Sequence, residues 1–288
     1  LGPRLVEINL IGPAAQLYLA AELPKEAVDV FIQSDNWSKA RRLAKEIDPS
    51  LVSYVESQQK FKLKNQGNVE QLADIDIASA LDLLAEQGQW TRCIEKAKQQ
   101  GNPILQKYLA QYAAQLIRDN EAPAALSLYL QYGSPALPQN YTVYHRIATE
   151  CFALREPDGM NLWKDLRGFL FQVVKAIKAM DAADNGALEK FELLLSIAHY
   201  YATRAACRQV SALQNISVKI SLALLRHTDL IPCDKGFYEA GMDLRQLGRE
   251  SEAFVMLNHY LDVCEAIEEG SGDLVDHTDL GSTDFPSS

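Results

Sequence analysis

Long hydrophobic runs are missing from this 288-residue chain, and so is any excess of basic residues. No apolar stretch approaches the roughly 18 to 20 residues that a membrane-spanning helix needs, so the sequence predicts no transmembrane segment. The formal net charge is −10, with 28 Lys and Arg against 38 Asp and Glu. A nucleic-acid-binding protein normally carries a basic stripe, so this balance argues against a nucleic-acid partner. The first residues also lack a basic stretch followed by an apolar core, which argues against a signal peptide.

Cysteine is scarce and scattered. The five cysteines lie far apart along the chain, a spacing that gives neither a zinc knuckle nor a disulfide framework. We expect reduced, mostly buried thiols. The sequence also has no His-Glu-x-x-His pair, no Gly-x-x-x-x-Gly-Lys-Ser/Thr loop and no Gly-x-Ser-x-Gly elbow. Metal, phosphate and nucleophile sites therefore lack sequence support, and we expect neither a cofactor nor an enzymatic activity.

The sequence does have a small-residue signature that recurs at a fixed offset. A turn-compatible residue is followed five positions later by a small residue and is often preceded, seven positions earlier, by another. This is the offset of the tetratricopeptide (TPR) helix–turn–helix repeat, in which two helices pack closely only where their crossing carries short side chains. The turn-to-small pairs are Glu22 with Ala27, Asp35 with Ala40, Gly88 with Cys93, Asn120 with Ala125 and Gly248 with Ala253; the earlier small residues are Ala15, Ala113 and Gly241.

Helical periodicity dominates the chain from Pro13 to about Ile267, without a convincing period-2 strand. One hairpin cannot bury its own apolar face, so the repeats must stack. The sequence predicts an all-α fold, a TPR-like helical-hairpin solenoid of about fourteen antiparallel helices. We divide it into TPR-like repeats over 1–133, irregular longer helices over 134–233, a terminal TPR-like hairpin over 234–269 and a flexible acidic tail over 270–288. The three long middle helices are expected over 161–180, 188–207 and 209–228.

Acidic residues are concentrated at the end of the chain. Seven of them lie from Glu265 onward, where there is no Lys or Arg. From Gly270 the composition turns to Gly, Ser, Thr, Asp and Pro, which cannot bury enough surface to offset the entropy of ordering. Three aspartates of the tail, at 273, 276 and 279, do not follow the order of an EF-hand calcium loop, so we interpret the tail as a linker. Because the chain begins with Leu1 rather than Met, we expect it to be an excised piece of a longer protein.

Two sets of residues are candidates for binding a partner. The first helix of each hairpin lines the concave groove of a stacked array, and a tyrosine among basic residues suits an extended acidic peptide or a helical one. The turn register places on that inner face Lys107, Arg118, Lys235, Tyr238, Met242 and Arg245. Two basic clusters are either solvated faces or docking sites for an acidic partner: Lys39, Arg41, Arg42 and Lys45, then Lys60, Lys62 and Lys64.

Histidine and tryptophan positions admit a structural and a functional interpretation. We interpret His199 as a packed core histidine rather than half of a buried acid–base pair. A helical hydrolase or regulatory enzyme with a site near His199 or His227 is the competing functional class. Trp37 and Trp90 each lie two residues after a turn, where we interpret the rings as wedges between repeats rather than as binding hot spots.

Several segments of the chain resemble one family. They are spread over nearly the whole sequence: Gly2–Leu10, Leu23–Ala27, Lys39–Arg42, Glu86–Trp90, Ala198–Arg204, Leu224–Gly241, Ala266–Gly270 and Asp276–His277. These segments are similar to the late TPR region of the intraflagellar transport 172 family, whose members are the largest peripheral subunits of the intraflagellar transport B complex. The segment 155–163 departs from the family pattern.

The resemblance implies the end of the family's solenoid, stopping before its C-terminal U-box-like domain. It implies a role in cilium assembly and train organisation, with contacts to other complex B subunits and to complex A, in the cilium or flagellum, basal body and cytoplasm. No catalytic residue transfers, because the family's ubiquitin-linked chemistry would lie in the absent domain. A vesicle-coat-like solenoid and a ubiquitin- or peptide-binding TPR module remain alternatives, and self-association stays open.

Overall fold

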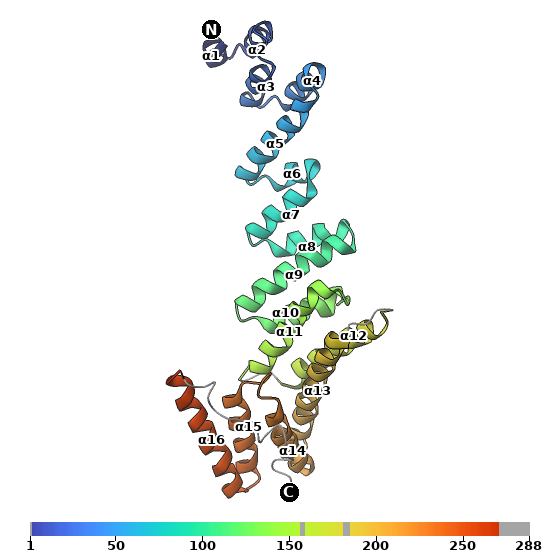
Figure 1. Ribbon diagram of the computed structural model, residues 1–288, viewed down its shortest axis with the longest axis vertical. Coiled ribbons are helices and arrows are strands. Elements are labelled where there is room, and N and C mark those ends of the chain that lie inside the picture. The colour runs from blue at the N-terminus through green and yellow to red at the C-terminus, as the bar shows by residue number, and fades with distance from the viewer. Residues whose placement is uncertain (1, 156–158, 181–184, 271–288) are drawn as a thin grey trace. The chain divides into compact units, whose positions relative to one another are not determined.

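The computed structural model describes residues 2–155, 159–180 and 185–270, and in these residues the protein is all-α. They form sixteen α-helices, two 3-10 turns and no strand, against the expected fourteen or so helices (Figure 1). The acidic tail beyond Gly270 lies outside the described residues. No helix in the described part of the chain is both long and apolar enough to cross a membrane.

The helices form two compact units, residues 1–108 and 109–288, and each is described by itself. The first eight helices are α1 (Gly2–Glu7), α2 (Ile11–Ala20), α3 (Pro24–Gln33), α4 (Trp37–Ile47), α5 (Ser50–Asn65), α6 (Val69–Ile75), α7 (Ile77–Glu86) and α8 (Trp90–Gln99). The others are α9 (Asn102–Arg118), α10 (Ala122–Tyr132), α11 (Pro138–Ala153), α12 (Gly159–Lys178), α13 (Asn185–Arg208), α14 (Gln214–Leu224), α15 (Cys233–Gln246) and α16 (Glu250–Glu268). Within each unit, consecutive helices pack on one another in neighbouring pairs, as expected of an α-helical solenoid. The four-part division of the sequence stays a prediction.

The predicted turn residues share one backbone conformation. All five have a positive φ, from 58° at Glu22 to 73° at Gly248. After each of them, the next backbone N–H donates to the carbonyl five residues earlier, as Asn36 does to Phe31 over 2.9 Å. This bond closes a Schellman motif, which ends a helix through one left-handed residue. The signature in the sequence is therefore a helix stop followed at once by a helix start.

Two further turns have the same geometry and were missed from the sequence. Asn9 and Gly67 have φ of 60° and 68°, and the residue after each donates the same backbone bond. The fifth residue after Asn9 is Ala14, and the fifth after Gly67 is Leu72; both side chains are fully buried. Leu72 is not small, which is why a search for short side chains passes over this copy.

The small residues of the signature are buried. Those five positions after a turn are at most 2% exposed, and those seven positions before a turn are also buried: Ala27, Ala40, Cys93, Ala125 and Ala253, then Ala15, Ala113 and Gly241. Gly241 marks a close approach, because a Cβ built there would come within 2.7 Å of the Leu257 side chain on α16. Short side chains therefore let α15 and α16 cross closely.

Ion pairs link neighbouring helices in the first unit. Lys60, Lys62 and Lys64 all project from α5, and each has a carboxylate partner at a helix end or turn. The Nζ–carboxylate distances are 2.8 Å for Lys60 to Asp76, 2.5 Å for Lys62 to Asp35 and 2.8 Å for Lys64 to Glu86. This basic cluster is therefore neutralised within the chain. Trp37 packs against the nearby buried cluster around Ala40, and Trp90 is 8% exposed, as the wedge interpretation expects.

Two middle helices of the second unit are long, as predicted, but the prediction of a third long helix is wrong. Helices α12 and α13 correspond to the predictions over 161–180 and 188–207. The helix expected over 209–228 is instead the short α14, flanked by the 3-10 turns η1 (Ser211–Leu213) and η2 (Leu225–His227). A 3-10 turn keeps a nearly helical spacing of apolar residues, so periodicity alone does not reveal the interruption.

Candidate docking surface

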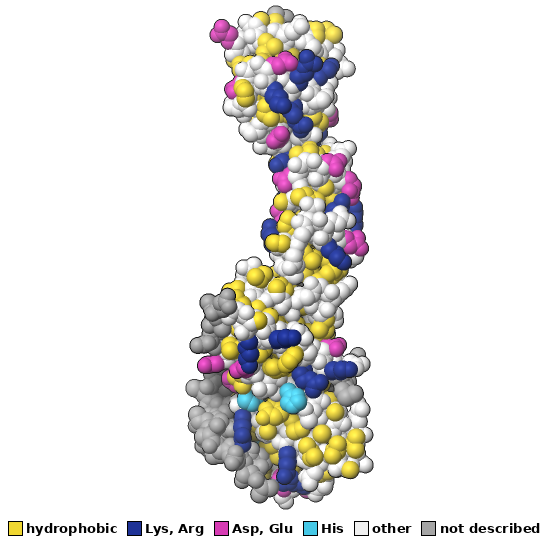
Figure 2. Space-filling model, turned by 90° about the vertical axis from the view of Figure 1, so that its right-hand side faces the viewer, with side chains coloured by type: hydrophobic (Ala, Val, Ile, Leu, Met, Phe, Trp, Pro, Cys, Tyr) yellow, Lys and Arg dark blue, Asp and Glu magenta, His cyan; other side chains and the backbone are white. Residues whose placement is uncertain are grey.

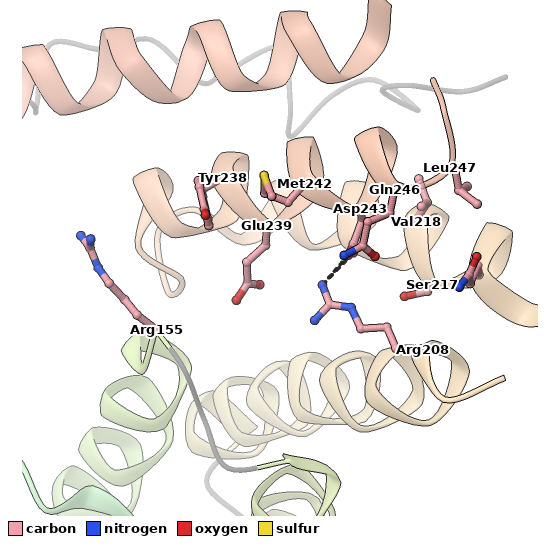
Figure 3. Close-up of a pocket in the computed structure, with 11 residues that line it drawn as sticks. Arg155, Arg208, Ser217, Val218, Tyr238, Glu239, Met242, Asp243, Gln246 and Leu247 are labelled. Carbon is pink, nitrogen blue, oxygen red and sulfur yellow. Dashed lines mark hydrogen bonds and ion pairs between the residues drawn. The ribbon is translucent and has the colours of Figure 1, made fainter. Parts of the chain in front are cut away.

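A pocket lies between α13, α14 and α15 in the second unit. Its volume is about 440 Å³, and Figure 3 shows Tyr238 and Met242 of α15 on one side and Arg208 of α13 on the other. Other residues that line it are Ser217, Val218, Gln246 and Leu247. We call this the α15 pocket. The sequence placed Tyr238 and Met242 together on an inner face, and both line the pocket, with Tyr238 46% exposed.

Lys235 does not belong to this surface, which corrects the expectation from the sequence. It is only 4% exposed, and its ammonium group donates to the backbone carbonyl of Phe152 on α11. The same group lies 5.0 Å from the ring centre of Tyr201 and 5.6 Å from that of Trp163. Burial lowers the pKa of Lys235 to about 8. The helices α11 to α13 cover this turn of α15, so Lys235 stabilises the contact between helices and cannot reach a partner.

Lys235 sits over a stack of aromatic rings contributed by three helices. Tyr201 of α13 stacks on Trp163 of α12 with centroids 4.2 Å apart, and on Phe152 of α11 at 5.7 Å. Arg204 lies 4.7 Å from the Tyr201 ring. Cations over aromatic faces are attracted by the ring quadrupole, more strongly when they are desolvated. This stack fixes α15 against the long helices and so holds the α15 pocket in place.

A partly buried ionic network links α13 to α15 beside the α15 pocket. Arg204 is 4% exposed and pairs with Glu239 at 2.6 Å. Arg208 reaches both oxygens of Asp243 at 2.7 and 2.8 Å, and Ser221 donates to the same carboxylate at 2.5 Å. Buried charges are tolerated only when they are paired and hydrogen-bonded in this way.

The ionic network was missed in the sequence, although a signal for it exists. Arg204 and Arg208 are four residues apart on α13, and Glu239 and Asp243 are four residues apart on α15. This spacing puts each pair on one face of its helix, so the two rows can meet. The pairing partners lie far apart in sequence, and nothing in a single sequence says that α13 and α15 face each other.

The remaining basic candidates are spread over the chain rather than gathered at one site. Arg245 and Arg118 are exposed and do not line the α15 pocket. Lys107, in the first unit, is exposed, lies 5.0 Å from the ring centre of Tyr108 and is 3.9 Å from Asp82.

The first basic cluster is also partly engaged within its own unit. Arg41 donates to Gln59 at 3.1 Å, and Arg42 pairs with Glu46 on the same helix at 2.9 Å. Lys45 is exposed. This cluster therefore has less free charge than the sequence count indicates, and its docking of an acidic partner stays a prediction.

His199 is exposed on α13, so the interpretation as a packed core histidine is wrong. The helix turns its buried stripe, which includes Ile197, Ala198 and Tyr201, toward the core and leaves His199 outside. His227 lies in the 3-10 turn η2, where burial lowers its pKa. Among the described residues, no group of His, Cys, Asp and Glu side chains is placed to hold a metal ion.

Comparison with known proteins gives long alignments to one set of relatives. The chain is 64% identical over 293 residues to the Intraflagellar transport protein 172 homolog of Drosophila melanogaster, covering 100% of this chain and 17% of that protein. It is 46% identical over 288 residues to the Homo sapiens homolog, covering 99% and 16%. To Intraflagellar transport protein osm-1 of Caenorhabditis elegans it is 34% identical over 289 residues, covering 98% and 16%.

No family model matches the chain. The chain spans about a sixth of the length of the relatives it matches. The alignments nevertheless cover 98 to 100% of this chain, at 34 to 64% identity. This chain belongs to the intraflagellar transport protein 172 family.

Proposed function

We propose that this segment is a non-enzymatic docking scaffold of an intraflagellar transport B complex subunit. It contributes to cilium assembly and train organisation by contacting other complex B subunits and complex A. Its place of action is the cilium or flagellum, the basal body and the cytoplasm. The names of its relatives support the transport role, and the docking surface on the second unit supports the scaffold role.

The observation that carries the proposal is the α15 pocket. Tyr238 is half exposed beside Met242, on a helix that two ion pairs link to α13. A rigid aromatic anchor with a flexible thioether neighbour is typical of protein-binding surfaces. Arg208 on the far side gives the pocket a polar edge that can orient a peptide.

A mutational test uses the full-length protein and purified complex A and complex B subunits. Tyr238→Ala is expected to weaken binding of at least one subunit by about tenfold or more, because hot-spot aromatics carry much of an interface's free energy. Phe61→Ala, which removes an exposed aromatic of the first unit, serves as the matched control. Unchanged affinity for every subunit, both in Tyr238→Ala and in Met242→Asp, would contradict the proposal.

Two alternative functions give different results in the same preparation. A vesicle-coat-like scaffold would co-purify with coat components instead of transport subunits. A ubiquitin-binding TPR module would show NMR shifts at Tyr238 and Met242 on titration with ubiquitin, and we expect none.

A further inference from the structure

A second surface lies on the outer side of α12 and α13, away from the α15 pocket. It is a shallow groove of about 480 Å³ lined by Arg167, Gly168, Phe171, Ser196, His199 and Tyr200. We call it the α12–α13 groove. Figure 2 is turned so that this side of the second unit faces the viewer, and hydrophobic side chains gather there beside basic and histidine side chains.

The apolar residues of the groove are not needed by the core. Phe171 is 54% exposed and Tyr200 is 38% exposed, whereas their neighbours Leu170 and Tyr201 are almost fully buried. The core-facing residues of both helices are therefore buried without any contribution from Phe171 or Tyr200. Exposed large apolar side chains that gather around one groove are a sign of an interaction site.

Gly168 independently indicates an interaction site in the α12–α13 groove. It lies inside α12, where glycine destabilises a helix relative to alanine. Nothing within 4 Å would meet a Cβ at this position, so no packing within the chain requires a glycine. Its backbone is helical, so no turn requires one either. What the missing side chain does provide is a hollow in the floor of the groove, through which another helix can approach closely.

The lining of the groove, as far as the structure describes it, includes basic side chains and no acidic one. Among the described residues that line it, Arg167 and His199 are the ionisable groups besides Tyr200, and none is acidic. One turn away on α12, Lys164 is exposed near Gly168 and Lys175 near Phe171, and one acidic residue, Asp165, is exposed there as well. Arg167 forms no ion pair within the described part of the chain.

We propose that the α12–α13 groove binds an amphipathic α-helix of a partner protein, with an apolar stripe flanked by carboxylates. The inference rests on the scaffold function proposed above and adds the site and the chemistry of one partner. The partner's apolar stripe packs on Phe171 and Tyr200 and approaches the chain at Gly168. Its carboxylates face Arg167 and the two flanking lysines. A helix fits because the groove runs between two helices, and a third helix packs into such a groove by the ordinary rules of helix packing.

The test measures binding of a labelled synthetic helix to this chain by fluorescence anisotropy. The probe carries a leucine stripe flanked by glutamates, and the comparison probe has lysines in place of the glutamates. We expect saturable binding of the glutamate probe and about tenfold or more weaker binding of the lysine probe. Arg167→Glu is expected to reduce this preference.

A substitution at Gly168 distinguishes an effect on binding from an effect on folding. Gly168→Leu introduces a good helix former into open space, so the thermal midpoint is expected to hold or rise. Binding of the glutamate probe is expected to fall by about tenfold or more, because the new side chain fills the groove. Ser127→Leu, at a solvent-facing position of α10, is the control and should leave probe binding unchanged.

Three results would overturn the inference: no saturable binding of the glutamate probe, equal binding of the two probes, or unchanged binding by Gly168→Leu. Binding of the chain to anionic lipid vesicles is measured as a separate experiment. If they bind the chain and Gly168→Leu abolishes that binding while no helix probe binds, the groove is a membrane contact instead. If the groove test fails while Tyr238→Ala still weakens subunit binding, the scaffold proposal stands without it.

Discussion

Gly241 shows how one side chain sets the distance between two helices. Its missing Cβ leaves room for the Leu257 side chain, and Met256 Cβ lies 3.3 Å from the place a Cβ would take. The residues around this crossing, including Ala240, Leu244 and Ala253, form one buried cluster. The close fit of α15 on α16 therefore depends on a residue without a Cβ at this position.

Replacing Gly241 by Leu is expected to destabilise the chain by about 1 to 3 kcal/mol, because overpacking forces the helices apart. Gly12→Leu is the matched control, since nothing within 4 Å of Gly12 would meet a Cβ. Urea unfolding of both variants measures the effect. A loss of stability as large in Gly12→Leu as in Gly241→Leu would contradict the explanation by crossing distance.

The buried ammonium of Lys235 gives stability a pH dependence. Its pKa is about 8 in the folded chain, against 10.5 as the ordinary value, because burial disfavours the charged form. Between these values the unfolded chain binds more protons than the folded one, so this group makes stability rise with pH from about 8 to 10.5. Below pH 8 both states are protonated and the contribution is constant.

Lys235→Met removes this contribution and keeps a long side chain over the rings. Buried tyrosines such as Tyr201 have a raised pKa and work in the opposite direction at high pH, so the informative quantity is the difference between the two proteins. Urea midpoints compared at pH about 7.5 and about 9.5 should show the parent gaining stability relative to Lys235→Met. A constant difference across that range would argue against the low pKa.

At the scale of helices and turns, Asp76 joins two helices. It caps α7 by accepting from the backbone N–H groups of Ala78 at 3.1 Å and Ser79 at 3.3 Å, and it pairs with Lys60 at 2.8 Å. The Lys60 hydrogen bond, with those from Ser79, lowers the pKa of Asp76 to about 2. Its contribution to stability is therefore complete above the ordinary pKa of 3.8 and is lost as pH falls toward 2.

Removing the cap should destabilise the first unit. Asp76→Ala is expected to lower the unfolding free energy by about 1 kcal/mol, the usual value of an N-cap. Asp76→Asn keeps an acceptor for the backbone and loses only the charge, so its effect should be smaller. The two variants are compared by thermal unfolding near neutral pH. Equal losses would mean that the ion pair with Lys60 of α5, and not the cap of α7, accounts for the stabilisation.

Turns were the most predictable elements of this fold, because they depend on neighbours in sequence. Glu22, Asp35 and Asn120 could be recognised as turn residues from one offset, and each adopts the left-handed conformation that the offset requires. The end of the helix expected over 209–228 could not be recognised, since the 3-10 turns around α14 continue the apolar spacing.

Contacts between distant segments were the least predictable. Lys235 and Tyr238 are three residues apart on one helix and looked equivalent in the sequence. One is covered by α11 to α13, and the other lines a pocket. His199 and Gly168 line one exposed groove between α12 and α13, and the sequence alone does not predict that these two helices share it. Long-range packing decides these cases, and a local pattern does not contain it.

At the scale of the whole molecule, packed helices of the second unit support two exposed surfaces. The aromatic stack and the ionic network link helices of the second unit, and the α15 pocket and the α12–α13 groove are the two faces that we propose for partners. The relatives that the chain matches are about six times longer.

The most direct test of the docking account is a lysine crosslinking map of the full-length protein in its native transport assembly, read by mass spectrometry. We expect crosslinks to other subunits from exposed lysines beside the two faces, Lys164 and Lys175 near the groove and Lys219 on α14. If these lysines crosslink only within their own chain, while other regions of the same protein crosslink to subunits, the segment is not a docking surface.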